Sequence, residues 1–344
     1  MTAPDLHQSS RPPRSSGEHR PVDQHSSLDE HRTGDTGLAY HRLTHLLPEW
    51  SRWWRGLTTL LAALLVFLIL SGLLVTLTVV VLALLPGVNV GLGESLGDPA
   101  SPLGVFMALG MAALAAPSAW LGVRLGGWRD PRLLWSVTGL VRWELLRSRG
   151  ALIVLCPPAL LAVLSALVVD PGRPTAGAGA VVLSMLFALV LSPLAVIGLE
   201  LAFRGLAQQM VGTWIGGRLA GPLAAIALPV PFALLAQATP TTGVLLTAIV
   251  LAIATGALTW KTGGLELPIL LHAGALIPTV VLAPLSGPAL PGDGLLSAIT
   301  MPLVILGAAA GAWWWISRRD GLALGQPVVR PATARPVRRI DAWI

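Results

Sequence analysis

Long, nearly uninterrupted apolar runs are the feature that most constrains how this chain can fold. A helix needs about 20 apolar residues to cross the hydrocarbon core of a bilayer, and such runs follow one another here from residue 56 to residue 316. Of the 344 residues, 54% are hydrophobic and 12% are charged, and the mean hydropathy is +0.72. Because backbone polar groups in lipid must be satisfied within the structure, the sequence predicts an all-α, polytopic membrane protein.

The apolar runs divide into about eight predicted transmembrane helices. Arginine and lysine concentrate in every second connection between them, and Arg173 is the one basic residue in the alternate connections. Since cytoplasmic loops carry the excess of basic residues, both termini are predicted to be cytoplasmic. The expected helices cover residues 56–85, 103–125, 151–169, 178–203, 220–237, 244–260, 267–285 and 295–316.

Composition divides the chain into four predicted regions. Residues 1–36 are rich in Ser, Pro, Arg and His and have almost no large apolar residues, which predicts a disordered tail. Residues 37–55 alternate leucines and tryptophans with arginines, a pattern typical of an amphipathic juxtamembrane segment. The transmembrane domain is expected over residues 56–317, with a motif core at 178–285, and residues 318–344 are predicted to form a basic cytoplasmic tail.

Several other function classes fit the sequence poorly. The net charge of +6 comes with arginines beside the apolar runs, so orientation in the membrane explains it and no nucleic-acid partner is expected. His41 and His45 have the i, i+4 spacing of two ligands on one helix face, but no nearby cysteine or paired acid completes a metal site. No internal repeat is visible, which makes a transporter the weakest hypothesis. The excess of arginine over lysine, with much Ala, Gly and Pro, favours a bacterial plasma-membrane protein.

Glu200, Arg204 and His272 are the ionisable residues expected at membrane depth. Each costs about 2.5–3.5 kcal/mol at the centre of a transmembrane helix, so each is a candidate for function. Glu200 and Arg204 are four residues apart and can pair on one helix face. His272 follows Glu266 by six residues and is expected at a depth similar to that of Glu200. A glutamate and a histidine so placed could activate water, although the spacing alone slightly favours an intrahelical ion pair beside a core histidine.

The stretches around these residues resemble the motifs of a known family. GLELAFRG, at residues 198–205, is similar to the EExxxR motif of the CPBP intramembrane proteases, the CAAX-protease and bacteriocin-processing group. LTWKTGGLELPILLHAGAL, at residues 258–276, resembles the region of the family in which a TGGLE-like turn precedes an HxxxN helix. PFALLAQ, at residues 231–237, occupies the place of the FxxxH motif between them.

The resemblance implies a catalytic set that this chain keeps only in part. Glu200, Arg204 and His272 match family positions, whereas the leading glutamate, the second-motif histidine and the asparagine are replaced. Gln237 lies beside the second-motif position and could offer an amide in place of the histidine. Glu200 and His272 alone supply too few ligands for a catalytic zinc, so no metal or other cofactor is expected. The replacements are Leu199, Ala236 and Leu276.

From this partial match we expect a catalytically impaired family member that binds or regulates membrane peptides or proteins within the bilayer. Loss of one general base or oxyanion donor typically lowers a rate by two to four orders of magnitude, and three such groups are missing. The alternative hypothesis is an active intramembrane endopeptidase that hydrolyses peptide bonds near the cytoplasmic face. In that case Glu200 would be the base, Arg204 would hold it, His272 would donate to the oxyanion and Gln237 would assist.

Overall fold

The computed structural model describes residues 37–84, 101–126, 130–168, 177–215, 242–285 and 295–334. All regular structure in these ranges is helical, and two isolated β-bridges are the only strand-like pairings among them. Within the described residues, seven helices are long and apolar enough to cross a membrane, which confirms the all-α, polytopic prediction. They are α2 (Trp53–Leu84), α4 (Pro102–Leu125), α6 (Arg149–Val168), α7 (Ala178–Glu200) with its continuation to Trp214, α11 (Thr242–Thr262), α12 (Glu266–Leu282) and α13 (Leu295–Arg319).

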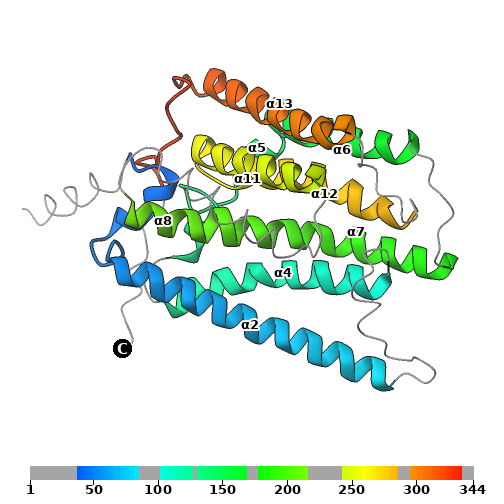
Figure 1. Cartoon of the computed structure of the whole chain (residues 1–344). Helices are drawn as coiled ribbons and strands as arrows, with labels where there is room; N and C mark the ends of the chain where they lie inside the picture. Colours follow the sequence, from blue (N-terminus) through cyan, green and yellow to red (C-terminus); the bar gives the residue numbers. More distant parts are fainter. Residues whose placement is uncertain are drawn as a thin grey trace, which may run out of the picture.

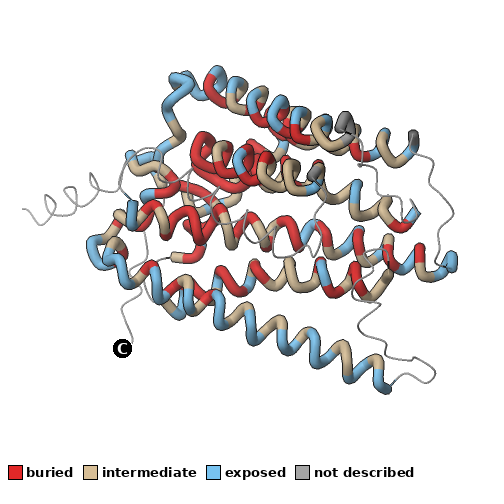
Figure 2. The backbone as a smooth tube through the Cα atoms, in the orientation of Figure 1, coloured by how far each residue is buried: buried red, intermediate tan, exposed pale blue. Residues whose placement is uncertain are grey.

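The helices pack side by side in a layered bundle (Figure 1). Helix α4 lies between α2 and α7, and α12 packs against α7 and α6. Helix α13 covers α11 and α6. Most α2 side chains are exposed or half-buried (Figure 2), and no residue in its most apolar 18-residue window is buried, as expected for a helix with a wide lipid-facing surface.

One helix differs from its predicted boundary. The segment expected at 178–203 continues without a break through a π-helical stretch, η3 (Leu201–Ala207), into α8 (Gln208–Trp214). The apolar run stops near Phe203, but buried polar residues such as Gln208 and Gln209 extend the helix at the protein interior. The predicted end was therefore wrong because hydropathy reports contact with lipid and not helix continuity.

The connections at one end of the bundle form an ordered cap, which we call the basic end. It comprises residues 37–52, 130–148, 261–265 and 320–334, including the short helices η1 (Tyr40–Leu46), η2 (Pro131–Leu134) and α5 (Trp143–Leu146). Apart from Arg204, all described arginines and lysines lie in or beside these segments. They are Arg42, Arg52, Arg55, Arg124, Arg132, Arg142, Arg147, Arg149, Lys261, Arg318, Arg319 and Arg330.

The two ends of the described chain meet at the basic end. Ala39 forms a β-bridge with Val329, and the backbone N–H of Arg330 donates to the Leu38 carbonyl at 2.9 Å. Lys261 is fully buried, and its ammonium donates to three carbonyls of the segment after α13, those of Ala323, Leu324 and Gln326. The segment after α13, expected only as a basic tail, is thus packed against the bundle.

The predicted span at 220–237 lies outside the described residues. Of the residues that flank it, Trp214 reaches the basic end, where its indole N–H donates to the Trp53 carbonyl at 2.8 Å. Thr242 begins α11, whose other end carries Lys261 at the basic end. The flanking helices therefore stop at opposite ends of the bundle, as an eighth span would require.

Candidate functional site

Glu200 is the residue around which the three predicted site residues gather. It ends α7 and is fully buried. Its Oε1 lies 2.7 Å from His272 Nδ1 and 3.2 Å from Arg204 Nη1. Because a carboxylate can only accept, His272 Nδ1 is the donor in the first contact. Glu200, Arg204 and His272, 72 residues apart in the chain at the widest, therefore form one buried cluster.

The helix geometry around Glu200 is unusual. The next seven residues form a π-helix, in which hydrogen bonds run from i to i+5, and such turns occur frequently at functional sites. Two residues before Glu200, Gly198 faces α4 so closely that a Cβ would lie 2.4 Å from the Ala112 carbonyl oxygen. Only glycine allows this approach, which brings the start of the π-turn against α4.

A bidentate ion pair between Arg142 and Glu266 fixes the helix that carries His272. Arg142 Nη2 donates to Glu266 Oε2 at 2.7 Å and Arg142 Nε donates to Glu266 Oε1 at 3.0 Å, while Nη1 donates to the Thr262 carbonyl. Glu266 is the first residue of α12. A Cβ on Gly264 would press on Arg142 Nη2 and Glu266 Oε2, so a larger residue there would displace this pair. The Arg142–Glu266 ion pair sets the position of α12 and hence of His272.

The cluster contains hydrogen-bonding atoms that no described residue satisfies. Glu200 Oε2, Arg204 Nε and both amide atoms of Gln208 are buried without a partner among the described residues. Burying an unpaired polar group costs free energy, and such groups are rare in native structures. Glu200 contacts Arg204, and Gln208 follows four residues later in the same continuous helix, so we infer that the three side chains form one polar row. The row has capacity for a ligand or for water.

Sequence reasoning missed two parts of this site. Gln208 carries no charge and follows the motif, and its four-residue spacing from Arg204 was the available signal. Arg142 and Glu266 are separated by 124 residues, and nothing in the sequence pairs them. Of the replaced positions, Leu199 and Leu276 are half-buried. Ala236 and Gln237 lie outside the described residues, so the role of Gln237 stays a prediction.

The donor set does not fit a catalytic metal. Zinc in catalytic sites takes three protein ligands and an open position, and Glu200 and His272 supply two. No group of three or more His, Cys, Asp or Glu side chains occurs in the described ranges. His41 and His45 lie in η1, a 3-10 helix with three residues per turn, so their four-residue spacing does not put them on one face.

Charge compensation explains how the cluster is held inside the bundle. A buried carboxylate requires a paired charge and further hydrogen bonds, and Arg204 and His272 provide both on Oε1. The second oxygen, Oε2, then remains available to accept a hydrogen bond. The arrangement can bind a backbone N–H or polarise a water molecule. The family pattern has a glutamate and an asparagine at the positions of Leu199 and Leu276, and the cluster lacks both polar groups.

Comparison with known proteins bears on the same segment. Residues 181–276 match the family model for type II CAAX prenyl endopeptidase Rce1-like proteins. The match includes Glu200, Arg204 and His272, and it confirms the resemblance to CAAX proteases. None of the curated proteins and none of the solved structures compared with the chain matches it.

Proposed function

Because residues 181–276 match the Rce1-like, CAAX-protease family model, we propose that this multi-pass membrane protein binds a peptide segment of another membrane protein and does not hydrolyse it efficiently. Binding would present or regulate that partner within the bilayer. From the arginine-rich composition we place the protein in a bacterial plasma membrane, with its basic end in the cytoplasm.

The unsatisfied polar row carries the proposal. An extended peptide backbone offers N–H and C=O groups in alternation, and these need partners inside a membrane. Glu200 Oε2 can accept from a peptide N–H, and Arg204 Nε can donate to a peptide carbonyl. The Gln208 amide can do either. A bound segment would therefore satisfy groups on both sides that are otherwise buried without partners.

The replaced family positions support impaired hydrolysis. Leu199 stands where an additional carboxylate is expected and Leu276 where an amide is expected, one turn beyond His272. Neither can orient water or stabilise an oxyanion. Ala236 removes the second-motif histidine as well. The remaining carboxylate is held by Arg204 and His272, which stabilises the fold whether or not chemistry occurs.

The Glu200–His272 contact favours a second candidate, an intramembrane endopeptidase. In this mechanism Glu200 Oε2 takes a proton from a water molecule whose oxygen attacks the peptide carbonyl. The same proton then passes to the amine that leaves when the C–N bond breaks. Arg204 would hold the carboxylate, and Gln237 would donate to the oxyanion together with His272 Nε2, which requires a proton on both ring nitrogens of His272. The 2.7 Å contact is the observation in its favour.

A binding measurement on the full chain in nanodiscs tests the first proposal. The probe is a panel of dye-labelled peptides, each with an apolar stretch followed by a polar tail, read by fluorescence anisotropy. For a peptide that binds, Gln208→Leu should weaken affinity about 5-fold and Glu200→Gln about 10-fold, the range for one lost hydrogen bond and one lost charged acceptor. Thr255→Val is the control, because the buried Thr255 hydroxyl already donates to the Leu251 carbonyl of its own helix. Equal affinity for all four proteins would refute the role of the polar row.

A further inference from the structure

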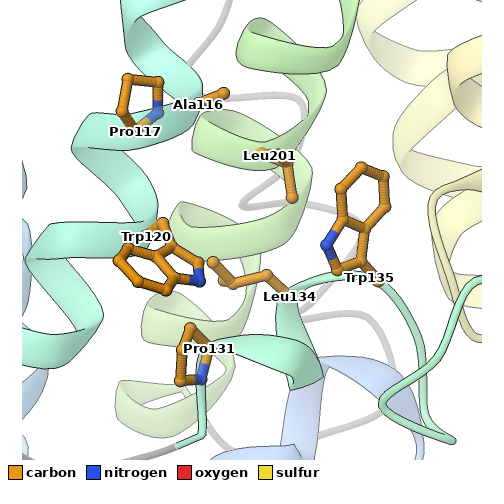
Figure 3. Close-up of a pocket in the computed structure, with 7 residues that line it drawn as sticks. All are labelled: Ala116, Pro117, Trp120, Pro131, Leu134, Trp135 and Leu201. Atoms are coloured by element: carbon orange, nitrogen blue, oxygen red, sulfur yellow. The ribbon is translucent and has the colours of Figure 1, made fainter.

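An apolar pocket of about 310 Å³ lies outside the Glu200 cluster, between α4, η2 and the start of η3 (Figure 3). It is lined by two tryptophans, two prolines, two leucines and an alanine, and no charged side chain lines it. Ala116 and Trp120 line it from α4, Leu134 from η2 and Leu201 from η3. The pocket is separate from the polar row, although Leu201 directly follows Glu200.

Water is a poor occupant of this pocket. A stable internal water makes about three hydrogen bonds, and the lining consists almost entirely of carbon atoms. An empty pocket would lose dispersion contacts along its whole lining. Because α4 and the helix that contains Leu201 are apolar and long enough to cross a membrane, a hydrocarbon chain is the occupant whose chemistry matches the walls.

The rim of the pocket carries positive charge. The Arg124 guanidinium lies 3.9 Å from the centroid of the Trp120 ring, which lines the pocket. Arg132 belongs to η2 together with Pro131 and Leu134, two other lining residues. Both arginines are exposed, and neither forms a salt bridge with a described residue. Asp130, the acid nearest to both arginines in the sequence, accepts from the Arg132 backbone N–H at 3.0 Å, so two cations and one anion stand at the rim among the residues that the structure describes.

The rim also lies at one end of a membrane-length helix, where lipid headgroups are expected. Trp120 and Arg124 occupy the last turns of α4, beside the basic end. Tryptophan is enriched at membrane interfaces, and arginine near helix ends reaches headgroup phosphates. An apolar pocket with a cationic rim at this depth matches the two parts of one lipid molecule.

We propose that this pocket is a binding site for an anionic glycerophospholipid. One acyl chain lies in the pocket against Trp120 and Leu134, and the phosphate contacts Arg124 and Arg132. Through Leu201 the lipid also supports the helix turn that holds Glu200. The site does not rest on the proposed peptide binding, and each can fail without the other.

Quenching of tryptophan fluorescence by brominated lipid tests the proposal on the full chain. The protein is reconstituted in phosphatidylcholine with a minor fraction of brominated phosphatidylglycerol, or of brominated phosphatidylcholine as the zwitterionic counterpart. Native protein should be quenched more strongly by the anionic lipid. Replacing both tryptophans that line the pocket, by Trp120→Phe and Trp135→Phe together, should remove that excess quenching, which assigns it to the pocket among the 13 tryptophans.

Variants then separate the charge from the cavity. Arg124→Gln and Arg132→Gln should each lower the preference for the anionic lipid about 5-fold, as expected for one basic residue at a membrane surface. Ala116→Phe should reduce quenching by filling the pocket while leaving both arginines in place. Arg318→Gln is the matched control, since Arg318 is also exposed and stacks on a tryptophan, Trp314, at 5.2 Å. It should retain native preference.

Three results would overturn the proposal. Equal quenching by the two brominated lipids would show that no anionic headgroup is selected. A preference that survives both arginine substitutions would place the lipid elsewhere. Thermal stabilisation of the detergent-solubilised protein by inorganic phosphate, equal to that by phosphatidylglycerol, would show a free-anion site without a chain. Because Arg124 and Arg132 are exposed, their substitution leaves the core intact.

Discussion

Glu200 joins elements that are far apart in the chain. Its Oε1 holds both Arg204, on its own helix, and His272, on α12. The cluster is buried, so its charges are screened little by solvent. Removing one partner of a buried ion pair leaves an uncompensated charge, whereas removing both can be nearly neutral.

This asymmetry predicts the outcome of a double-mutant cycle. Glu200→Gln should lower the free energy of unfolding by about 3–5 kcal/mol, because Arg204 then stays buried without a countercharge. Adding Arg204→Met should recover much of that loss. Reversible unfolding of the reconstituted protein by denaturant measures both. A double variant no more stable than Glu200→Gln would show that Arg204 is balanced by another group.

His45, in η1, gives a pH dependence outside the membrane. Partial burial lowers its pKa below the ordinary value of 6.5, and the charge of Arg42 lowers it further. The unfolded chain therefore binds a proton first as the pH falls. We expect stability to decline from about pH 6.5 down to the folded-state pKa and then to level off. A His45→Gln variant should lose this part of the pH dependence in thermal melts from pH 7.5 to 5. An unchanged slope would contradict the assignment.

Some residues of the site could be predicted from the sequence, and others could not. Glu200, Arg204 and His272 were predictable because a charge at membrane depth is costly and so stands out. Gln208 was hidden because an amide costs less than a charge and leaves no comparable signal. The Arg142–Glu266 ion pair could not be predicted, because contacts between distant segments depend on how the helices pack and periodicity does not encode this packing.

At the scale of helices, glycine sets the spacing between α7 and α4. A Cβ on Gly198 would overlap the Ala112 carbonyl, whereas one on Gly179 in the same helix would meet nothing within 4 Å. Hydropathy located these helices correctly, since lipid contact determines it. It could not locate η3, because a π-turn changes hydrogen bonding without changing polarity.

The two glycines therefore predict opposite effects of the same substitution. Gly198→Ala should destabilise the protein by about 1–3 kcal/mol, the typical cost of overpacking, and should displace the turn that holds Glu200. Gly179→Ala should be neutral or stabilise slightly, since alanine favours helix over glycine. Comparison of the two variants in the same unfolding assay checks this. Similar stability for both would mean that α7 and α4 are not in close contact.

In the molecule as a whole, the basic residues are concentrated at one end of the bundle. Nearly all described basic residues lie at the basic end, where residues 37–39 and 329–330 also meet. The positive-inside rule then predicts that this end faces the cytoplasm. The meeting of the two described chain ends was not predictable from sequence, because it depends on Lys261 and Arg330 bonding to distant carbonyls.

Reporter fusions in a bacterial inner membrane test this orientation. Alkaline phosphatase fused after Leu84, at the opposite end of α2 from the basic end, should be active because it is exported. The same enzyme fused after Ile344 should be inactive, and a fluorescent protein fused there should fold and fluoresce. The reverse pattern would place the basic end outside and would contradict the predicted topology.

Cleavage of fluorogenic peptides by the reconstituted full chain tests whether the Glu200 cluster binds peptide without efficient hydrolysis. We expect the native protein and Glu200→Gln to show the same background rate. The triple variant Leu199→Glu, Ala236→His and Leu276→Asn should exceed that rate by at least about 100-fold, the typical contribution of one restored acid–base group. Cleavage by the native protein that Glu200→Gln abolishes would contradict the claim and would establish an active endopeptidase.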